Sequence, residues 1–114
     1  MTDLMYPTET AKFARRRREL RPEAEAAFHA FSKSVFEDGA LPAKMKQIIA
    51  VALAHVTQCP YCIKGHTKAA IRQGATDEEL MEAIWVAAEM RAGAAFAHSA
   101  LALEEMEKAA SATA

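Results

Sequence analysis

The spacing of the apolar residues constrains the fold of this chain more than any other feature, because they recur every three or four positions along most of the sequence. Residues three and four apart share one face of a helix, so this spacing predicts amphipathic helices. We find no convincing alternation of apolar and polar residues, which would predict a strand. The sequence therefore predicts an all-α fold.

Chain length and helix-end signals refine this prediction. The 114 residues suffice for one modest core, and no linker, repeat or low-complexity tract indicates a second domain, so 1–114 is expected to be a single domain. Proline in a first turn and glycine after a last turn are typical helix boundaries. The expected helices cover 9–20, 21–39 with Pro22 near its start, 42–58 beginning at Pro42, a stretch from Cys59 that stops at Gly74, and 79–110. Five or six helices result, depending on whether Gly93 divides the last one.

The last predicted helix is alanine-rich and apolar on more than one face. It follows a capping box, in which Thr76 and Glu79 can satisfy each other's backbone amides. A helix that is apolar all round is usually buried on several sides. In so small a chain, this pattern predicts burial against other subunits and therefore a homo-oligomer.

Charge and composition argue against several classes of partner. The net charge of −1 gives no reason to expect nucleic acid or an anionic membrane. The run from Arg15 to Arg18 points to all sides of a helix, close to Glu19, and is interpreted as a solvated or inter-subunit surface. The N-terminus has no signal-peptide pattern, and no segment has the roughly 18 consecutive apolar residues of a membrane span. We therefore expect a cytoplasmic protein that does not bind membranes.

The stretch CPYCIKGH, residues 59–66, contains both cysteines of the chain. Pro60 suits the first helical position, which places Cys59 at the N-cap and Cys62 in the first turn. The positive end of a helix favours thiolate over thiol, and a separation of three residues lets the two sulfurs form a disulfide. His66 lies one turn beyond Cys62 and can accept its proton. These features predict a dithiol redox centre.

Three alternatives compete with this interpretation. A zinc site would take three ligands from the two cysteines and His66. The nearest candidate for a fourth ligand is His55, which lies on an apolar helix and is more simply interpreted as a hydrogen-bonded core histidine. The cysteines can also be an inert buried pair, although the helix start and the histidine argue against that. A thioredoxin-like protein would need strands, and none is predicted. We therefore expect no metal and no cofactor.

The stretch KQIIAVALAHVTQCPYCIKGHTKAAIRQGATDEELMEAI resembles the carboxymuconolactone decarboxylase and AhpD-like superfamily, in its alkylhydroperoxidase-like branch. The resemblance is carried by an apolar helix, the C-x-x-C-x-x-x-H motif, an alanine-rich helix ending in Gly-Ala-Thr, and the acidic stretch that follows. It extends over about 41–98. It implies an all-α fold built around a helical hairpin, and assembly as a homotrimer or homohexamer.

The same resemblance implies a function and the roles of three residues. Cys62 would attack a small organic hydroperoxide, Cys59 would resolve the product to a disulfide, and His66 would belong to a proton relay. The cycle would need a dithiol or thioredoxin-like reductant. Two other functions stay open: a non-enzymatic redox sensor or stress-linked interaction protein, and a carboxymuconolactone-type decarboxylase, although such decarboxylases generally lack the cysteine pair.

One position departs from the peroxidase pattern. A glutamate of the relay lies twelve residues before the first cysteine in that branch, and Gln47 stands there in this sequence. Across an antiparallel hairpin that turns at Gln58, Gln47 and His66 are expected at similar heights. Glutamine can orient a histidine but cannot exchange a proton at neutral pH. Either another carboxylate replaces the glutamate, with Glu37, Glu82 and Glu89 as candidates, or peroxidase turnover is weak.

Overall fold

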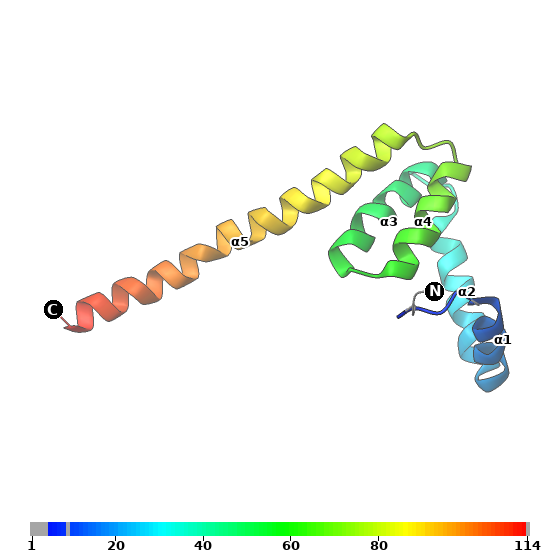
Figure 1. Cartoon of the computed structure of the whole chain (residues 1–114), viewed down its shortest axis with the longest axis horizontal. Helices are drawn as coiled ribbons and strands as arrows, with labels where there is room; N and C mark the ends of the chain where they lie inside the picture. Colours follow the sequence, from blue (N-terminus) through cyan, green and yellow to red (C-terminus); the bar gives the residue numbers. More distant parts are fainter. Residues whose placement is uncertain (1–4, 9, 114) are drawn as a thin grey trace. The chain divides into compact units, whose positions relative to one another are not determined.

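The computed structural model describes residues 5–8 and 10–113, and these form an all-α structure of five helices without strands. The helices are α1 (Thr10–Leu20), α2 (Pro22–Phe36), α3 (Ala43–Thr57), α4 (Pro60–Arg72) and α5 (Asp77–Thr113) (Figure 1). The predicted all-α class is confirmed. Glu9, where the first predicted helix begins, lies outside the described residues.

The chain divides into two compact units, Met1–Glu37 and Asp38–Ala114. The first unit contains α1 and α2, which pack on each other. Pro22 occupies the first turn of α2, as predicted, but the helix ends three residues before Gly39 because Glu37 has an extended backbone. The second unit contains α3, α4 and α5 and carries the cysteine pair. The single domain expected from the sequence stays a prediction.

Helix α3 begins after Pro42, whose backbone is extended. The side chain of Asp38 accepts a hydrogen bond of 2.6 Å from the backbone N–H of Ala43, one of the amides that an α-helix leaves without an internal partner. This contact and the fixed φ of the proline define the start of the helix. The start of α3 predicted at Pro42 is therefore confirmed.

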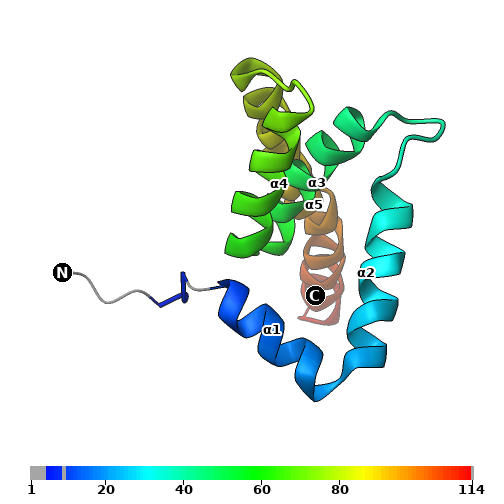
Figure 2. The same ribbon diagram turned by 90° about the vertical axis from the view of Figure 1, so that its right-hand side faces the viewer.

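Helices α3 and α4 form an antiparallel hairpin, seen side by side in both views (Figures 1 and 2). The hairpin turns at Gln58, which ends α3 in the left-handed conformation with φ of 57°. The backbone N–H of Cys59 then donates to the carbonyl of Ala54 at 3.2 Å. This tight connection brings the last turn of α3 next to the first turn of α4.

Helix α5 follows a second turn, at Gly74, where φ is 95°. A side chain is rarely tolerated at such an angle, which accounts for the glycine. The capping box is present: Thr76 N–H donates to Glu79 at 2.9 Å, and Glu79 N–H donates to the Thr76 hydroxyl at 3.1 Å. The helix then runs for 37 residues without a break at Gly93, so the structure has five helices rather than six. At 1.5 Å per residue, α5 is about 55 Å long.

A small core joins the three helices of the second unit. Val51 of α3 and Ala70 of α4 are fully buried, and Leu80 of α5 is 6% exposed. Ile48 and Ile84 pack against this cluster. The core lies along the hairpin and the first part of α5, so it fixes α3 against both neighbours and thereby sets the register between Gln47 and α4.

Candidate redox site

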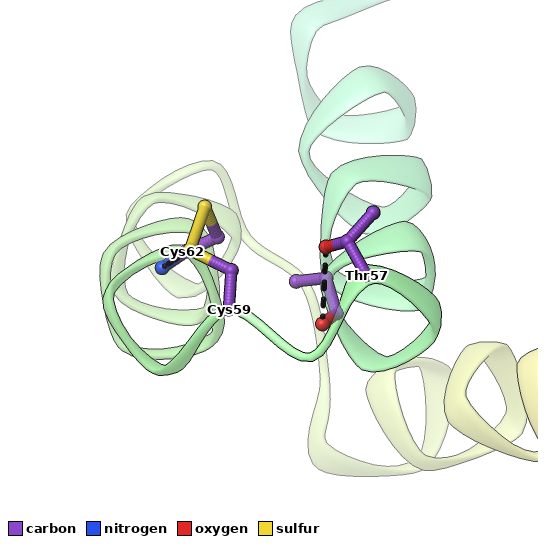
Figure 3. Close-up of a disulfide and its surroundings, with 4 residues drawn as sticks. Thr57, Cys59 and Cys62 are labelled. Carbon is purple, nitrogen blue, oxygen red and sulfur yellow. Dashed lines mark hydrogen bonds between the residues drawn. A yellow bond between two sulfur atoms is a disulfide. The ribbon is translucent and has the colours of Figure 1, made fainter.

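The two cysteines lie at the start of α4, where they form a disulfide (Figure 3). Cys59 is the N-cap residue, and Pro60 takes the first helical position, as the sequence predicts. The Cα atoms of Cys59 and Cys62 are 5.2 Å apart, within the range that a disulfide spans. The helix start therefore holds the two sulfur atoms together.

The surroundings of the sulfur atoms favour negative charge. The backbone N–H of Cys62 donates to the Cys59 sulfur at 3.2 Å, so this sulfur replaces the oxygen atom of a usual N-cap. The aligned peptide dipoles of α4 add a partial positive charge at the same end. Both cysteines are half-buried, so solvent screening is partial. When the disulfide is reduced, this environment stabilises a thiolate.

His66 lies one helical turn beyond Cys62, and its ring contacts Gln47 on the other arm of the hairpin. The distance from His66 Nδ1 to Gln47 Oε1 is 2.8 Å, and both residues are half-buried. An amide oxygen only accepts hydrogen bonds, so Nδ1 carries the proton. In the neutral imidazole, Nε2 is then the basic nitrogen. The expected proximity of Gln47 and His66 is confirmed, while the catalytic roles of the site residues stay predictions.

The other candidate residues from the sequence lie elsewhere in the chain. Glu82 and Glu89 lie exposed on α5, and Glu37 belongs to the first unit. His55 is half-buried, and its Nδ1 lies 2.7 Å from the carbonyl oxygen of Val51, in agreement with the hydrogen bond expected for it. The described part of the chain contains no group of three or more His, Cys, Asp and Glu side chains arranged to hold a metal ion.

One contact at the site was not predicted from the sequence. Arg91 of α5 donates a hydrogen bond of 2.8 Å to the carbonyl of Val56, in the last turn of α3. The two residues are 35 positions apart, so no local pattern indicates that they meet. Only the packing of α5 against α3 brings the guanidinium to the cysteine-bearing turn.

Over the residues described, every helix is either too short or too polar to cross a bilayer.

Similar proteins agree with this fold. Residues 22–105 match the model of the carboxymuconolactone decarboxylase family. Over 108 residues, the chain is 55% identical to uncharacterized protein 4 in the cox locus of Paracoccus denitrificans, which covers 95% of this chain and 96% of that protein.

Two solved structures of family proteins are also similar to this chain. A carboxymuconolactone decarboxylase family protein from Legionella pneumophila is 39% identical, with a TM-score of 0.65 over 89% of this chain and 87% of the other. A family protein from Thermotoga maritima, for which an antioxidative role has been suggested, is 28% identical, with a TM-score of 0.53 over 73% of this chain and 92% of that one.

Proposed function

Because this chain belongs to the carboxymuconolactone decarboxylase family, we propose that it is a thiol-dependent peroxidase of the alkylhydroperoxidase-like kind. Its substrates would be small organic hydroperoxides, reduced through a dithiol–disulfide cycle of Cys59 and Cys62. The antioxidative role suggested for the Thermotoga maritima relative supports a function in peroxide reduction.

The observation that carries this proposal is the arrangement of three side chains on one helix end. Cys59 and Cys62 lie within disulfide distance at the positive end of α4, and His66 follows Cys62 by one turn. Gln47 holds the histidine ring through Nδ1, which leaves Nε2 as its basic nitrogen. A nucleophilic thiolate, a base and a resolving thiol are the groups that a two-cysteine peroxidase needs.

In the first step, His66 takes the thiol proton of Cys62, and the thiolate attacks the terminal oxygen of the hydroperoxide. An S–O bond forms while the O–O bond breaks, and the alkoxide leaves as the alcohol after taking a proton. Cys62 becomes a sulfenic acid, oxidised by two electrons. The imidazolium of His66, one helical turn from Cys62, can supply the proton that the alkoxide takes.

In the second step, the Cys59 thiolate attacks the Cys62 sulfur, so that an S–S bond forms while the S–O bond breaks, and the hydroxide leaves as water after taking a proton. An external dithiol, such as a thioredoxin-like protein in a reducing cytoplasm, then gives two electrons and two protons to restore both thiols and itself becomes a disulfide. Each cycle therefore converts one hydroperoxide and one dithiol into an alcohol, water and a disulfide.

A second candidate, a non-enzymatic redox sensor, is favoured by Gln47. An amide orients His66 but does not carry its proton onward, so peroxide turnover can be slow even where the disulfide forms readily. Rapid, repeated loss of peroxide in the presence of a dithiol favours the enzyme. A single slow oxidation favours the sensor.

We also propose that the protein works as a homo-oligomer, a trimer or a hexamer, whose subunits cover α5. Residues 94–112 of this helix are all exposed, and the Phe96 side chain is 83% exposed. Most of the stability of helices in proteins comes from tertiary packing, and apolar side chains gain free energy from burial. The large apolar residues that are more than half exposed on α5 are Trp85, Val86, Met90, Phe96, Leu101, Leu103 and Met106.

Two single-cysteine variants test the peroxidase assignment. Cys59→Ser should still react with tert-butyl hydroperoxide and accumulate a sulfenic acid that a dimedone probe labels at Cys62. Cys62→Ser should lose the reaction, because the remaining thiol is not followed by a histidine one turn further along α4. Equal hydroperoxide consumption by Cys62→Ser and the unaltered protein would overturn the role of Cys62.

A further inference from the structure

Two helix ends of opposite polarity meet at the turn that carries the cysteines. The amino-terminal end of α4 is positive and favours a thiolate, whereas the carboxyl-terminal end of α3 is negative and opposes one. Among the last carbonyls of α3, that of Ala54 accepts the backbone N–H groups of Gln58 and Cys59. The carbonyl of Val56 accepts the guanidinium of Arg91 at 2.8 Å.

Arg91 therefore places a permanent positive charge on the negative end of α3. Basic side chains near a helix C-terminus bind its last carbonyls and offset its dipole. Three peptide units join Val56 to Cys59, so their Cα atoms are at most about 11 Å apart. The guanidinium lies one hydrogen bond beyond Val56, so at physiological ionic strength, where the Debye length is about 8 Å, its charge acts on the sulfur atoms in attenuated form.

We propose that Arg91 is a positioning residue of the redox centre, which acts through the end of α3 to favour the reduced form of the cysteine pair. The inference rests on the proposed dithiol function. Reduction of the Cys59–Cys62 disulfide takes two electrons and two protons from a dithiol, which becomes a disulfide, and one product thiol can then release its proton. A nearby cation stabilises the resulting thiolate and leaves the uncharged disulfide unaffected, so it shifts the equilibrium toward reduction.

Two histidines flank the cysteine pair in the sequence. His66 follows the cysteines on α4, and His55 precedes them on α3. A guanidinium, in contrast, is charged throughout the range of pH 5 to 8.

The test is an equilibrium with reduced and oxidised dithiothreitol at pH 7, in which the reduced fraction is measured by alkylation and intact mass. Arg91→Gln removes the charge and retains a side chain that can donate a hydrogen bond. Arg91→Lys retains the charge. Arg72→Gln, in the last turn of α4, removes the same charge far from the cysteines and serves as the control.

We expect Arg91→Gln to lower the equilibrium constant for reduction about two- to fivefold, which corresponds to a potential up to about 20 mV more negative. Arg91→Lys and Arg72→Gln should stay close to the unaltered protein. In about 1 M salt, where the Debye length is about 3 Å, the effect of Arg91→Gln should shrink.

Three results would overturn the inference. In the first, Arg91→Gln has the same equilibrium constant as the unaltered protein. In the second, Arg91→Lys is shifted as far as Arg91→Gln, which assigns the effect to the shape of the contact instead of its charge. In the third, the shift persists in high salt. An unaltered protein whose cysteines do not cycle with dithiothreitol would refute the proposed dithiol function itself, and the inference with it.

Discussion

His66 Nδ1 and Gln47 Oε1 lie 2.8 Å apart and join the two arms of the α3–α4 hairpin. The contact fixes the orientation of the imidazole and places its proton on Nδ1. In the peroxidases that this sequence resembles, a glutamate stands at the position of Gln47. An amide therefore contacts the histidine at the position where a relay of that kind would have its carboxylate.

Substitution of this amide should restore the missing proton acceptor. We expect Gln47→Glu to raise hydroperoxide turnover at pH 7 by about tenfold or more, because positioned acid–base groups contribute about 10²- to 10⁴-fold to such steps. Peroxide loss in the presence of excess dithiothreitol measures the change. Gln73→Glu, at the far end of α4, adds the same charge as a control. No gain with an unchanged urea midpoint would mean that the relay runs through another residue.

Removal of the imidazole should slow the first step. We expect His66→Asn to lower the rate of Cys62 oxidation by about 100-fold, because the thiol then lacks a neighbouring base. Stopped-flow measurement of thiol loss after mixing with hydroperoxide gives this rate. His29→Asn, on exposed α2, is the matched control. If both variants react at the rate of the unaltered protein, His66 takes no part in the chemistry.

The capping box gives a prediction for stability against pH. The pKa of Glu79 is lowered, first by the backbone N–H of Thr76 and further by Lys44, whose Nζ lies 3.2 Å away. A lowered folded-state pKa means that the stabilisation is complete above the ordinary value of 4.5 and is lost as pH falls through the lowered one. Glu79→Gln should therefore reduce the urea midpoint at pH 7 more than at pH 3.

Glu78→Gln serves as the control for that comparison. Glu78 lies beside Glu79 in the first turn of α5, so this substitution removes the same charge near the same helix end. At pH 7, Glu78→Gln should lower the urea midpoint less than Glu79→Gln does. An equal loss from Glu79→Gln at both pH values would show that the carboxylate charge does not stabilise the fold.

The assembly proposal predicts that charge on the exposed part of α5 separates the subunits. Phe96→Glu combined with Leu103→Glu should convert a trimer or hexamer into a species near the chain mass of 12.4 kDa in light scattering. Glu107→Gln, on the same helix, should leave the mass of the assembly unchanged. A monomeric unaltered protein at micromolar concentration would refute the proposal.

The sequence was sufficient to predict the features that depend on local chemistry. Pro60 and Cys59 start α4, and Thr76 and Glu79 cap α5, because each of these signals acts within one turn of the helix. The contact of Gln47 with His66 was also predictable. In a tight antiparallel hairpin, residues that lie a similar number of positions before and after the turn are at similar heights along the two helices.

Features that depend on packing could not be predicted in this way. The contact of Arg91 with Val56 requires the placement of α5 against α3, which the spacing of apolar residues leaves undetermined. The effect of Gly93 was also open, because a single glycine costs a helix about 1 kcal/mol and does not by itself end it. The continuous α5 shows that its alanine-rich neighbours outweigh this cost.

The most direct test of the redox centre is a count of thiols. The reduced protein is freed of reductant and metal, and its thiols are titrated before and after one equivalent of tert-butyl hydroperoxide. A redox centre of Cys59 and Cys62 predicts fast loss of both thiols of the chain and their recovery after addition of a dithiol. Two thiols that remain titratable after the peroxide treatment would contradict it.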